Sequence, residues 1–86
     1  MPSSVHVETP DLNSASVLRQ QLLDFDSSVK PLPTGRWKVS TQVFSDGMNA
    51  SLEIDRILVL VRQWLAAQDI ESTTVHLGSK TYVMLR

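Results

Sequence analysis

The sequence has no cysteine, three glycines and 6% aromatic residues. The lack of cysteine excludes disulfide bonds, thiolate zinc sites and a cysteine nucleophile, so stability has to come from packing or from association with another chain. The glycines, Gly35, Gly47 and Gly78, lie far apart, which excludes a glycine-rich phosphate-binding loop and leaves turns as their expected role. We expect a cytoplasmic location from this composition.

Charge of one sign and long apolar runs are also missing. The formal net charge is −1, and the eight basic and nine acidic residues are dispersed along the chain. Nucleic acid is therefore disfavoured as a partner, because nucleic-acid-binding domains gather positive charge on one face. No apolar run approaches the roughly 20 residues that cross a bilayer, and the first residues lack a signal-peptide pattern, so we expect a soluble protein that does not enter a membrane.

The remaining composition is typical of a small folded domain. The chain has 86 residues, of which 42% are hydrophobic and 20% charged, and we expect residues 1–86 to form a single domain. A chain of this size buries only about 60–65% of its unfolded surface, so its core should be thin.

The first half of the chain changes period twice. Residues 4–8 alternate Val5 and Val7 with polar residues, which predicts a strand, and residues 13–26 place apolar side chains three and four apart, which predicts a helix. The next segment, residues 27–35, contains two prolines, whose rings disfavour both helix and central strand, so we expect an extended connector.

The second half begins with strict alternation over residues 36–44, which predicts a strand. Residues 50–68 have helical spacing, and residues 72–85 predict a hairpin whose two-residue turn, Gly78 and Ser79, is of the II′ type. That turn predicts three cross-strand pairs, which gather Val75, Leu77, Tyr82 and Met84 on one buried face: Leu77 with Lys80, Val75 with Tyr82, and Thr73 with Met84.

These elements predict an α+β fold, a small two-layer α/β sandwich. Their order is strand, helix, strand, helix, strand, strand, and we expect a mixed sheet with both helices on one face. This order lacks one strand of the six-element split βαβ pattern, unless the proline connector supplies it. The opposite, open face of the sheet should carry mainly polar side chains: His6, Lys38, Ser40, Gln42, Thr74, His76 and Thr81.

No chemical motif carries a catalytic prediction. His6 and His76 fall on the open sheet face with Glu8 as the nearby carboxylate, but a metal site needs further ligands, so we interpret both as solvated strand residues. A nucleophile such as Ser40 would need an oriented base beside an oxyanion pocket, which nothing in the spacing supplies. We expect no enzymatic activity, catalytic residue, cofactor or metal.

The helix at residues 50–68 is more apolar than one buried face requires. Its core-facing side accounts for most of the run from Ile57 to Val61, but three apolar residues lie on other sides, next to two long polar side chains. The resulting candidate interface comprises Leu52, Arg56, Val59, Leu60 and Gln63. Coverage by the first helix or by the proline connector is the alternative explanation of this surplus.

The sequence therefore favours a non-enzymatic protein-interaction module that self-associates, as a homodimer, or docks on a protein partner through residues 50–68. A free sheet edge, at Val5 to Val7 or at Lys80 to Leu85, is a second expected contact. One alternative is a small-ligand-binding regulatory or sensor domain, which is an analogy from architecture. A weaker alternative is a single-strand nucleic-acid binder that uses Arg36, Trp37 and Lys38.

Overall fold

The computed structural model describes residues 3–43 and 48–86. The end of the predicted strand at residue 44 and the predicted turn at residues 45–47 lie outside this part of the chain. The elements follow one another along the chain as β1 (Ser3–Thr9), α1 (Leu12–Gln21), β2 (Ser27–Pro31), β3 (Trp37–Val43), α2 (Met48–Ala67), β4 (Ser72–Leu77) and β5 (Lys80–Leu85).

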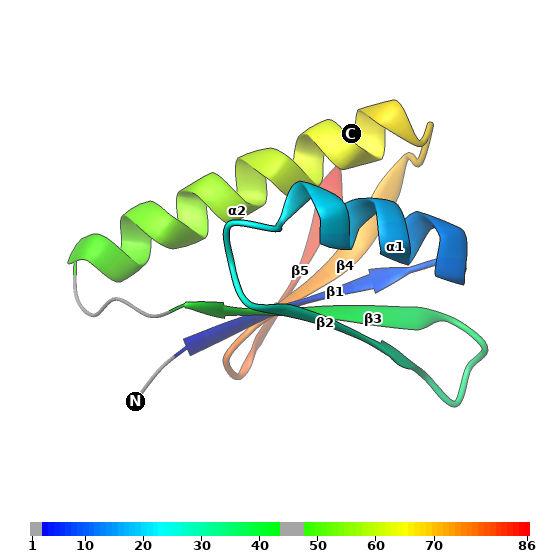
Figure 1. Ribbon diagram of the computed structural model, residues 1–86, viewed down its shortest axis with the longest axis horizontal. Helices are drawn as coiled ribbons and strands as arrows, with labels where there is room; N and C mark the ends of the chain where they lie inside the picture. Colours follow the sequence, from blue (N-terminus) through cyan, green and yellow to red (C-terminus); the bar gives the residue numbers. More distant parts are fainter. Residues whose placement is uncertain (1–2, 44–47) are drawn as a thin grey trace.

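The strands form one five-stranded sheet in the order β2-β3-β1-β4-β5. Every neighbouring pair is antiparallel, so the α+β class is confirmed and the predicted mixed sheet is wrong. Figure 1 shows both helices on the same side of the sheet, with α2 running diagonally across it. Neither of the two helices in the described residues covers the opposite face of the sheet.

The proline connector contains the missing strand. β2 pairs with β3 from Ser27 opposite Thr41 to Pro31 opposite Trp37, so the order is β-α-β-β-α-β-β. These residues form a sheet strand where the sequence predicted an extended connector, and the alternative that the connector supplies the missing strand is confirmed. Proline is tolerated here because β2 is an edge strand and Pro31 is its last residue. The first six elements thus complete the split βαβ pattern, and β5 adds a further strand.

The first helix is shorter than the period predicts. The Asp11 side chain caps it by accepting a bond of 2.7 Å from the Ser14 amide, but the helix ends at Gln21 and not at residue 26. By Asp26 the chain has joined the sheet, since its carbonyl oxygen accepts a 3.0 Å bond from the Gln42 amide. The apolar spacing continues past the helix because Phe25 still packs against the core.

The C-terminal hairpin has the predicted register. Its cross-strand pairs include Leu77 with Lys80, Val75 with Tyr82, and Thr73 with Met84. Gly78 has a φ of +60°, and Ser79 is not in the left-handed region, as a II′ turn requires. The ladder continues beyond β5, where the Arg86 amide donates a 2.9 Å bond to the Glu71 carbonyl oxygen.

The core lies between the sheet and the two helices. Alternate residues of β1, β3 and β4 face the helices, and Trp64 of α2 is the largest fully buried side chain. The buried apolar residues are Val5, Val7, Ala15, Leu18, Leu22, Val39, Val43, Ile57, Val61, Trp64, Leu65 and Val75. Neither helix in the described residues is long and apolar enough to cross a membrane.

Candidate interaction surface

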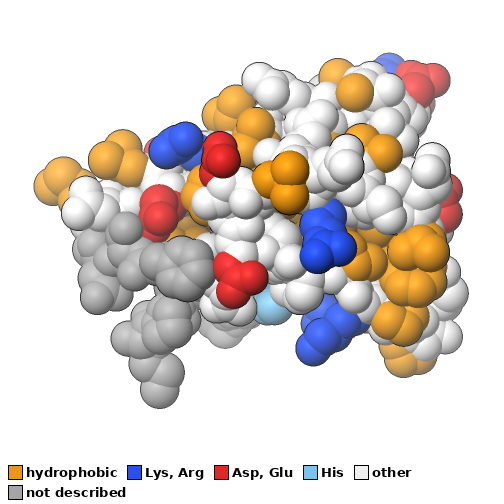
Figure 2. All heavy atoms as spheres, viewed as in Figure 1, with side chains coloured by type: hydrophobic (Ala, Val, Ile, Leu, Met, Phe, Trp, Pro, Cys, Tyr) orange, Lys and Arg blue, Asp and Glu red, His pale blue; other side chains and the backbone are white. Residues whose placement is uncertain are grey.

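The exposed side of α2 carries part of the predicted interface. Leu52 is 59% exposed and Val59 55% exposed, and Gln63 is also exposed. Leu60 is half-buried and packs against the core. Figure 2 shows hydrophobic side chains at the surface along α2. Of the three apolar residues predicted to lie outside the core-facing side, Leu52 and Val59 are therefore exposed and Leu60 packs against the core.

Arg56 lies on the flank of α2 that faces the α1–β2 connection. Its guanidinium carbon stands 5.9 Å from the centre of the Phe25 ring, within the range of a cation–π contact. The alternative explanation was coverage by the first helix or by the proline connector. It agrees with the contacts of Leu60 and Arg56, but not with the exposure of Leu52 and Val59.

The opposite flank of α2 borders an open groove. The groove separates α2 from the β4–β5 hairpin and has a volume of about 830 Å³. Most of its lining is apolar, and Asp55 and Arg62 of α2 are its charged residues. The lining residues are Ile54, Asp55, Leu58, Val59, Arg62, Val75, Leu77, Tyr82, Val83, Met84 and Leu85.

The groove exists because the helix layer does not cover β5. Tyr82 lies on the helix-facing side of β5 but is 47% exposed, whereas its cross-strand partner Val75 is buried. The prediction that all the apolar residues on this hairpin face are buried is therefore wrong for Tyr82. On the open face, Val83 and Leu85 are 68% and 65% exposed.

β5 also has a free edge. It is the last strand in the sheet order, and within residues 3–43 and 48–86 it pairs with β4 alone. Hydrogen-bonded and non-hydrogen-bonded positions alternate in an antiparallel pair, and the Arg86 to Glu71 bond fixes which positions are bonded. The peptide N–H and C=O groups of Thr81, Val83 and Leu85 therefore point away from the sheet.

The two sheet edges differ in sequence. β2, at the other edge, ends in Pro31 and carries Lys30, two features that discourage pairing with another chain. β5 contains no proline, and its last residues, Tyr82 to Leu85, are uncharged and apolar or aromatic. β5 is thus the edge that is chemically suited to accept a further strand.

The open face of the sheet carries the two histidines side by side. His6 of β1 is the register partner of His76 of β4, so the expectation that both lie on this face is confirmed. The His6 Nδ1 atom is 2.8 Å from Ser40 Oγ, and its Nε2 atom is 3.0 Å from Ser4 Oγ. Both ring nitrogens of His6 therefore have hydrogen-bond partners.

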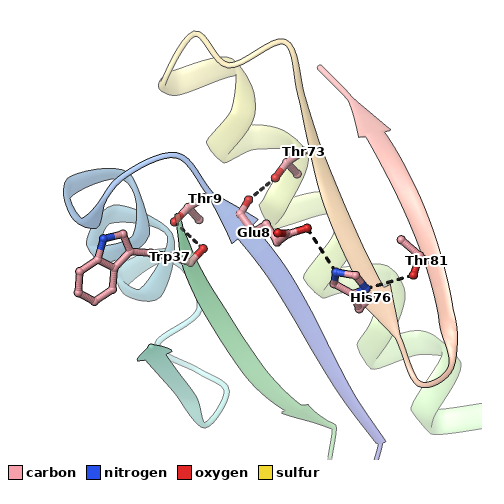
Figure 3. A network of polar contacts seen from close by, with 6 residues as sticks. All are labelled: Glu8, Thr9, Trp37, Thr73, His76 and Thr81. Atoms are coloured by element: carbon pink, nitrogen blue, oxygen red, sulfur yellow. Dashed lines mark hydrogen bonds and ion pairs between the residues drawn. The ribbon is translucent and has the colours of Figure 1, made fainter. Parts of the chain in front are cut away.

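Both ring nitrogens of His76 also have polar partners. His76 Nδ1 is 3.1 Å from Thr81 Oγ1, and His76 Nε2 is 3.4 Å from a carboxylate oxygen of Glu8 (Figure 3). In the same region the hydroxyl of Thr73 donates to the Glu8 carbonyl oxygen, and that of Thr9 donates to the Trp37 carbonyl oxygen at 3.1 Å. These bonds tie neighbouring strands together.

Burial and neighbouring charges lower the pKa of His6 below its ordinary value of 6.5. Desolvation is the largest cause, followed by the positive charge of Lys38 and then by His76 and Lys30. Among the described residues no group of three or more His, Asp or Glu side chains is arranged to hold a metal ion. The polar atoms of this face bond to one another and do not converge on a cavity, since the groove lies on the other side of the sheet.

The predicted nucleic-acid residues are divided between the faces. Trp37 is half-buried, lies on the helix-facing side of β3 and packs against the core. Lys38 lies on the open face between Lys30 and Glu8 in the sheet register. The aromatic ring and this base therefore do not form one stacking surface.

The groove and the free edge of β5 were only partly visible in the sequence. Of the two predicted edges, the one at residues 80–85 is confirmed, and the one at residues 5–7 is wrong because β1 pairs with both β3 and β4. The sequence did not predict that Ile54, Asp55, Leu58 and Arg62 line a groove. The sequence feature that could have indicated the groove is that residues 50–68 are apolar on more than one side of the helix. Comparisons with protein-family models, with curated proteins and with solved structures found no match to this chain.

Proposed function

We propose that this chain is a non-enzymatic protein-interaction module that binds another protein chain along the groove between α2 and β5 and the free edge of β5. The observation that carries the proposal is the apolar groove of about 830 Å³, which opens directly beside an unpaired strand. A bound chain would cover Val59 and Tyr82 and would pair with the outward backbone groups of β5. Proteins that bind a partner by strand addition use both the burial of apolar side chains and the pairing of backbone groups.

The polar open face supports the same assignment indirectly. Its histidines are saturated by Ser4, Ser40, Thr81 and Glu8, so their bonding serves the sheet. Most of the exposed large apolar side chains in the described residues lie on α2 and β5, and the others are Leu12 and Leu23. Exposed apolar groups beside a groove are typical of a protein interface.

Site-specific photo-crosslinking tests this proposal in the cells that produce the protein. A photoreactive residue at Val83 is expected to give adducts whose sequenced peptides identify the bound chain, whether it is a second copy or another protein. The same residue at Leu23, which is exposed on the α1–β2 connection, is the control and should give few adducts. Val59→Asp, on the α2 wall of the groove, should displace the bound chain from β5 and so remove the Val83 adducts. Equal yields at both positions, or adducts that persist with Val59→Asp, would contradict the proposal.

A small-ligand-binding regulatory domain is the second candidate. The groove volume falls within the range of about 300–1,000 Å³ that ligand sites occupy. A ligand that binds the native state raises its thermal stability, so a metabolite panel in a thermal-shift assay tests this candidate. A ligand that stabilises the parent chain but not the Val59→Asp variant would support it, and a panel without any stabilising compound would count against it.

A further inference from the structure

We infer that the chain bound at this surface is a second copy of the same protein, related by a two-fold axis that passes beside β5. This inference rests on the proposed function, because it names the partner of the same groove and edge. Under this symmetry β5 pairs antiparallel with the partner's β5, and the two sheets become continuous. The two α2 helices then lie on one face of the joined sheet and run in opposite directions.

The flank of α2 that lines the groove is self-complementary. Leu58 and Val59 are at its centre. Asp55 lies three residues before Leu58, and Arg62 lies three residues after Val59. When two copies of such a helix pack antiparallel, each Asp55 faces the partner's Arg62 and the two apolar centres meet. An isologous interface requires this kind of self-complementary pattern.

The two charged residues are available for such pairs. Asp55 and Arg62 are both exposed, and neither makes an ion pair with any residue in the described ranges 3–43 and 48–86. One turn further out on the same flank, Ser51 and Ala66 are again symmetric about the centre, and both are small. Small side chains at the ends of the contact allow two helices to approach closely.

The free edge of β5 fits the same axis. Its outward groups belong to alternate residues, with Val83 in the middle and Thr81 and Leu85 on either side. An axis through Val83 pairs it with the partner's Val83 and pairs each Thr81 with a Leu85, so every outward N–H and C=O group of the three residues finds a partner. Tyr82 then lies beneath the paired helices, where it fills the groove.

A second copy accounts for the surface better than an unrelated chain does. An unrelated partner can match any pattern of charges, whereas the symmetric placement of Asp55 and Arg62 about Leu58 and Val59 is required only when the surface meets itself. The charges of Asp55 and Arg62 also cancel within the pair, which agrees with a net charge of only −1 for the chain.

Charge reversal tests the helix contact. Light scattering and sedimentation of the purified chain should show its mass rise from monomer to dimer with concentration. Asp55→Arg and Arg62→Asp should each raise the dimer dissociation constant by about ten- to a hundredfold, because each variant places like charges at two contacts. An equimolar mixture of the two variants should form a heterodimer with restored affinity, since every contact then joins an Arg to an Asp. The variant with both substitutions should also dimerise like the parent chain.

Disulfide trapping tests the strand contact and its register. The chain has no cysteine, so a single Val83→Cys substitution introduces the only thiol. Directly opposed residues of a hydrogen-bonded antiparallel pair are about 5.5 Å apart at Cα, within the range that a disulfide spans. Val83→Cys should therefore oxidise rapidly to a covalent dimer, whereas Thr81→Cys and a control Leu23→Cys should not.

The outcomes separate this inference from the proposed function. A chain that stays monomeric up to about 100 µM, variants that fail to rescue each other, or equal oxidation at positions 81 and 83 would overturn the inference. Photo-crosslinks from Val83 to a different protein would in that case leave the proposed function standing. Circular dichroism of each variant establishes that a loss of mass reflects lost association and not unfolding, since Asp55, Arg62 and Val83 are exposed.

Discussion

The indole N–H of Trp64 in α2 donates a 2.9 Å hydrogen bond to the carbonyl oxygen of Ser14 in the first turn of α1. Both residues are buried, and they join segments that lie 50 residues apart in the sequence. The bond fixes α2 against α1 on one flank. The opposite flank of α2 is left to border the groove with β5.

Replacement of Trp64 by Phe should lower the free energy of unfolding by about 2 kcal/mol, because it removes a buried hydrogen bond and leaves a small cavity. Urea unfolding followed by far-ultraviolet circular dichroism measures this change. Trp37→Phe is the matched control: Trp37 is only half-buried and its indole has no hydrogen bond to the described residues, so its loss should cost less. Equal losses for the two variants would show that the Trp64 bond contributes nothing.

The position of His6 predicts a loss of stability at acidic pH. Burial, Lys38, His76 and Lys30 lower its pKa in the folded chain, so the unfolded chain binds the proton more readily. The stabilising contribution of neutral His6 is present above pH 6.5, the ordinary pKa, and is lost as the pH falls through that value towards the lower pKa of the folded chain.

Urea midpoints measured between about pH 7.5 and about pH 5 should therefore fall less steeply in His6→Gln than in the parent chain. The glutamine keeps a polar side chain beside Ser40 and Ser4 but does not titrate. An NMR titration of the His6 ring protons provides an independent readout, and an apparent pKa at or above 6.5 would contradict the expected direction.

The two apolar residues next to each other on α2 should behave differently. Leu60→Ala should destabilise the chain by about 1–2 kcal/mol, since Leu60 packs against the core. Val59→Ala should change stability by less than about 0.5 kcal/mol, because Val59 is exposed. Both are measured at protein concentrations below those at which the chain associates. The reverse order would mean that the helix is rotated relative to the sheet.

The elements that the sequence predicts best are those whose pattern is local. Gly78 and Ser79 define a two-residue turn, and once that turn is set, every pair in the hairpin follows, including Val75 with Tyr82. The helix at Met48–Ala67 and the strand at Trp37–Val43 also follow from their periods. In the helix and in β3 the predicted core-facing residues pack against the core, whereas in the hairpin Tyr82 stays 47% exposed despite its correct register.

The missed features depend on relations between distant segments. Pro31 argues against a central strand, but only the sheet order shows that β2 is an edge strand where a terminal proline is harmless. The antiparallel sheet follows from this added strand, which reverses the chain before β3. The groove depends on the diagonal path of α2 over the sheet, and this path is set by contacts such as Trp64 with Ser14 that no period reveals.

The contrast between the two sheet edges gives a final prediction. Val83→Lys should weaken association and reduce aggregation on heating, because it places a charge on the free edge and sets two lysines opposite each other when β5 strands pair. The stability of the monomer should change little, since Val83 is 68% exposed. Ser28→Lys on the β2 edge is the matched control and should leave both properties unchanged, because Lys30 and Pro31 already protect that edge. If Ser28→Lys suppresses aggregation as strongly as Val83→Lys does, added charge explains the effect and the β5 edge has no special role.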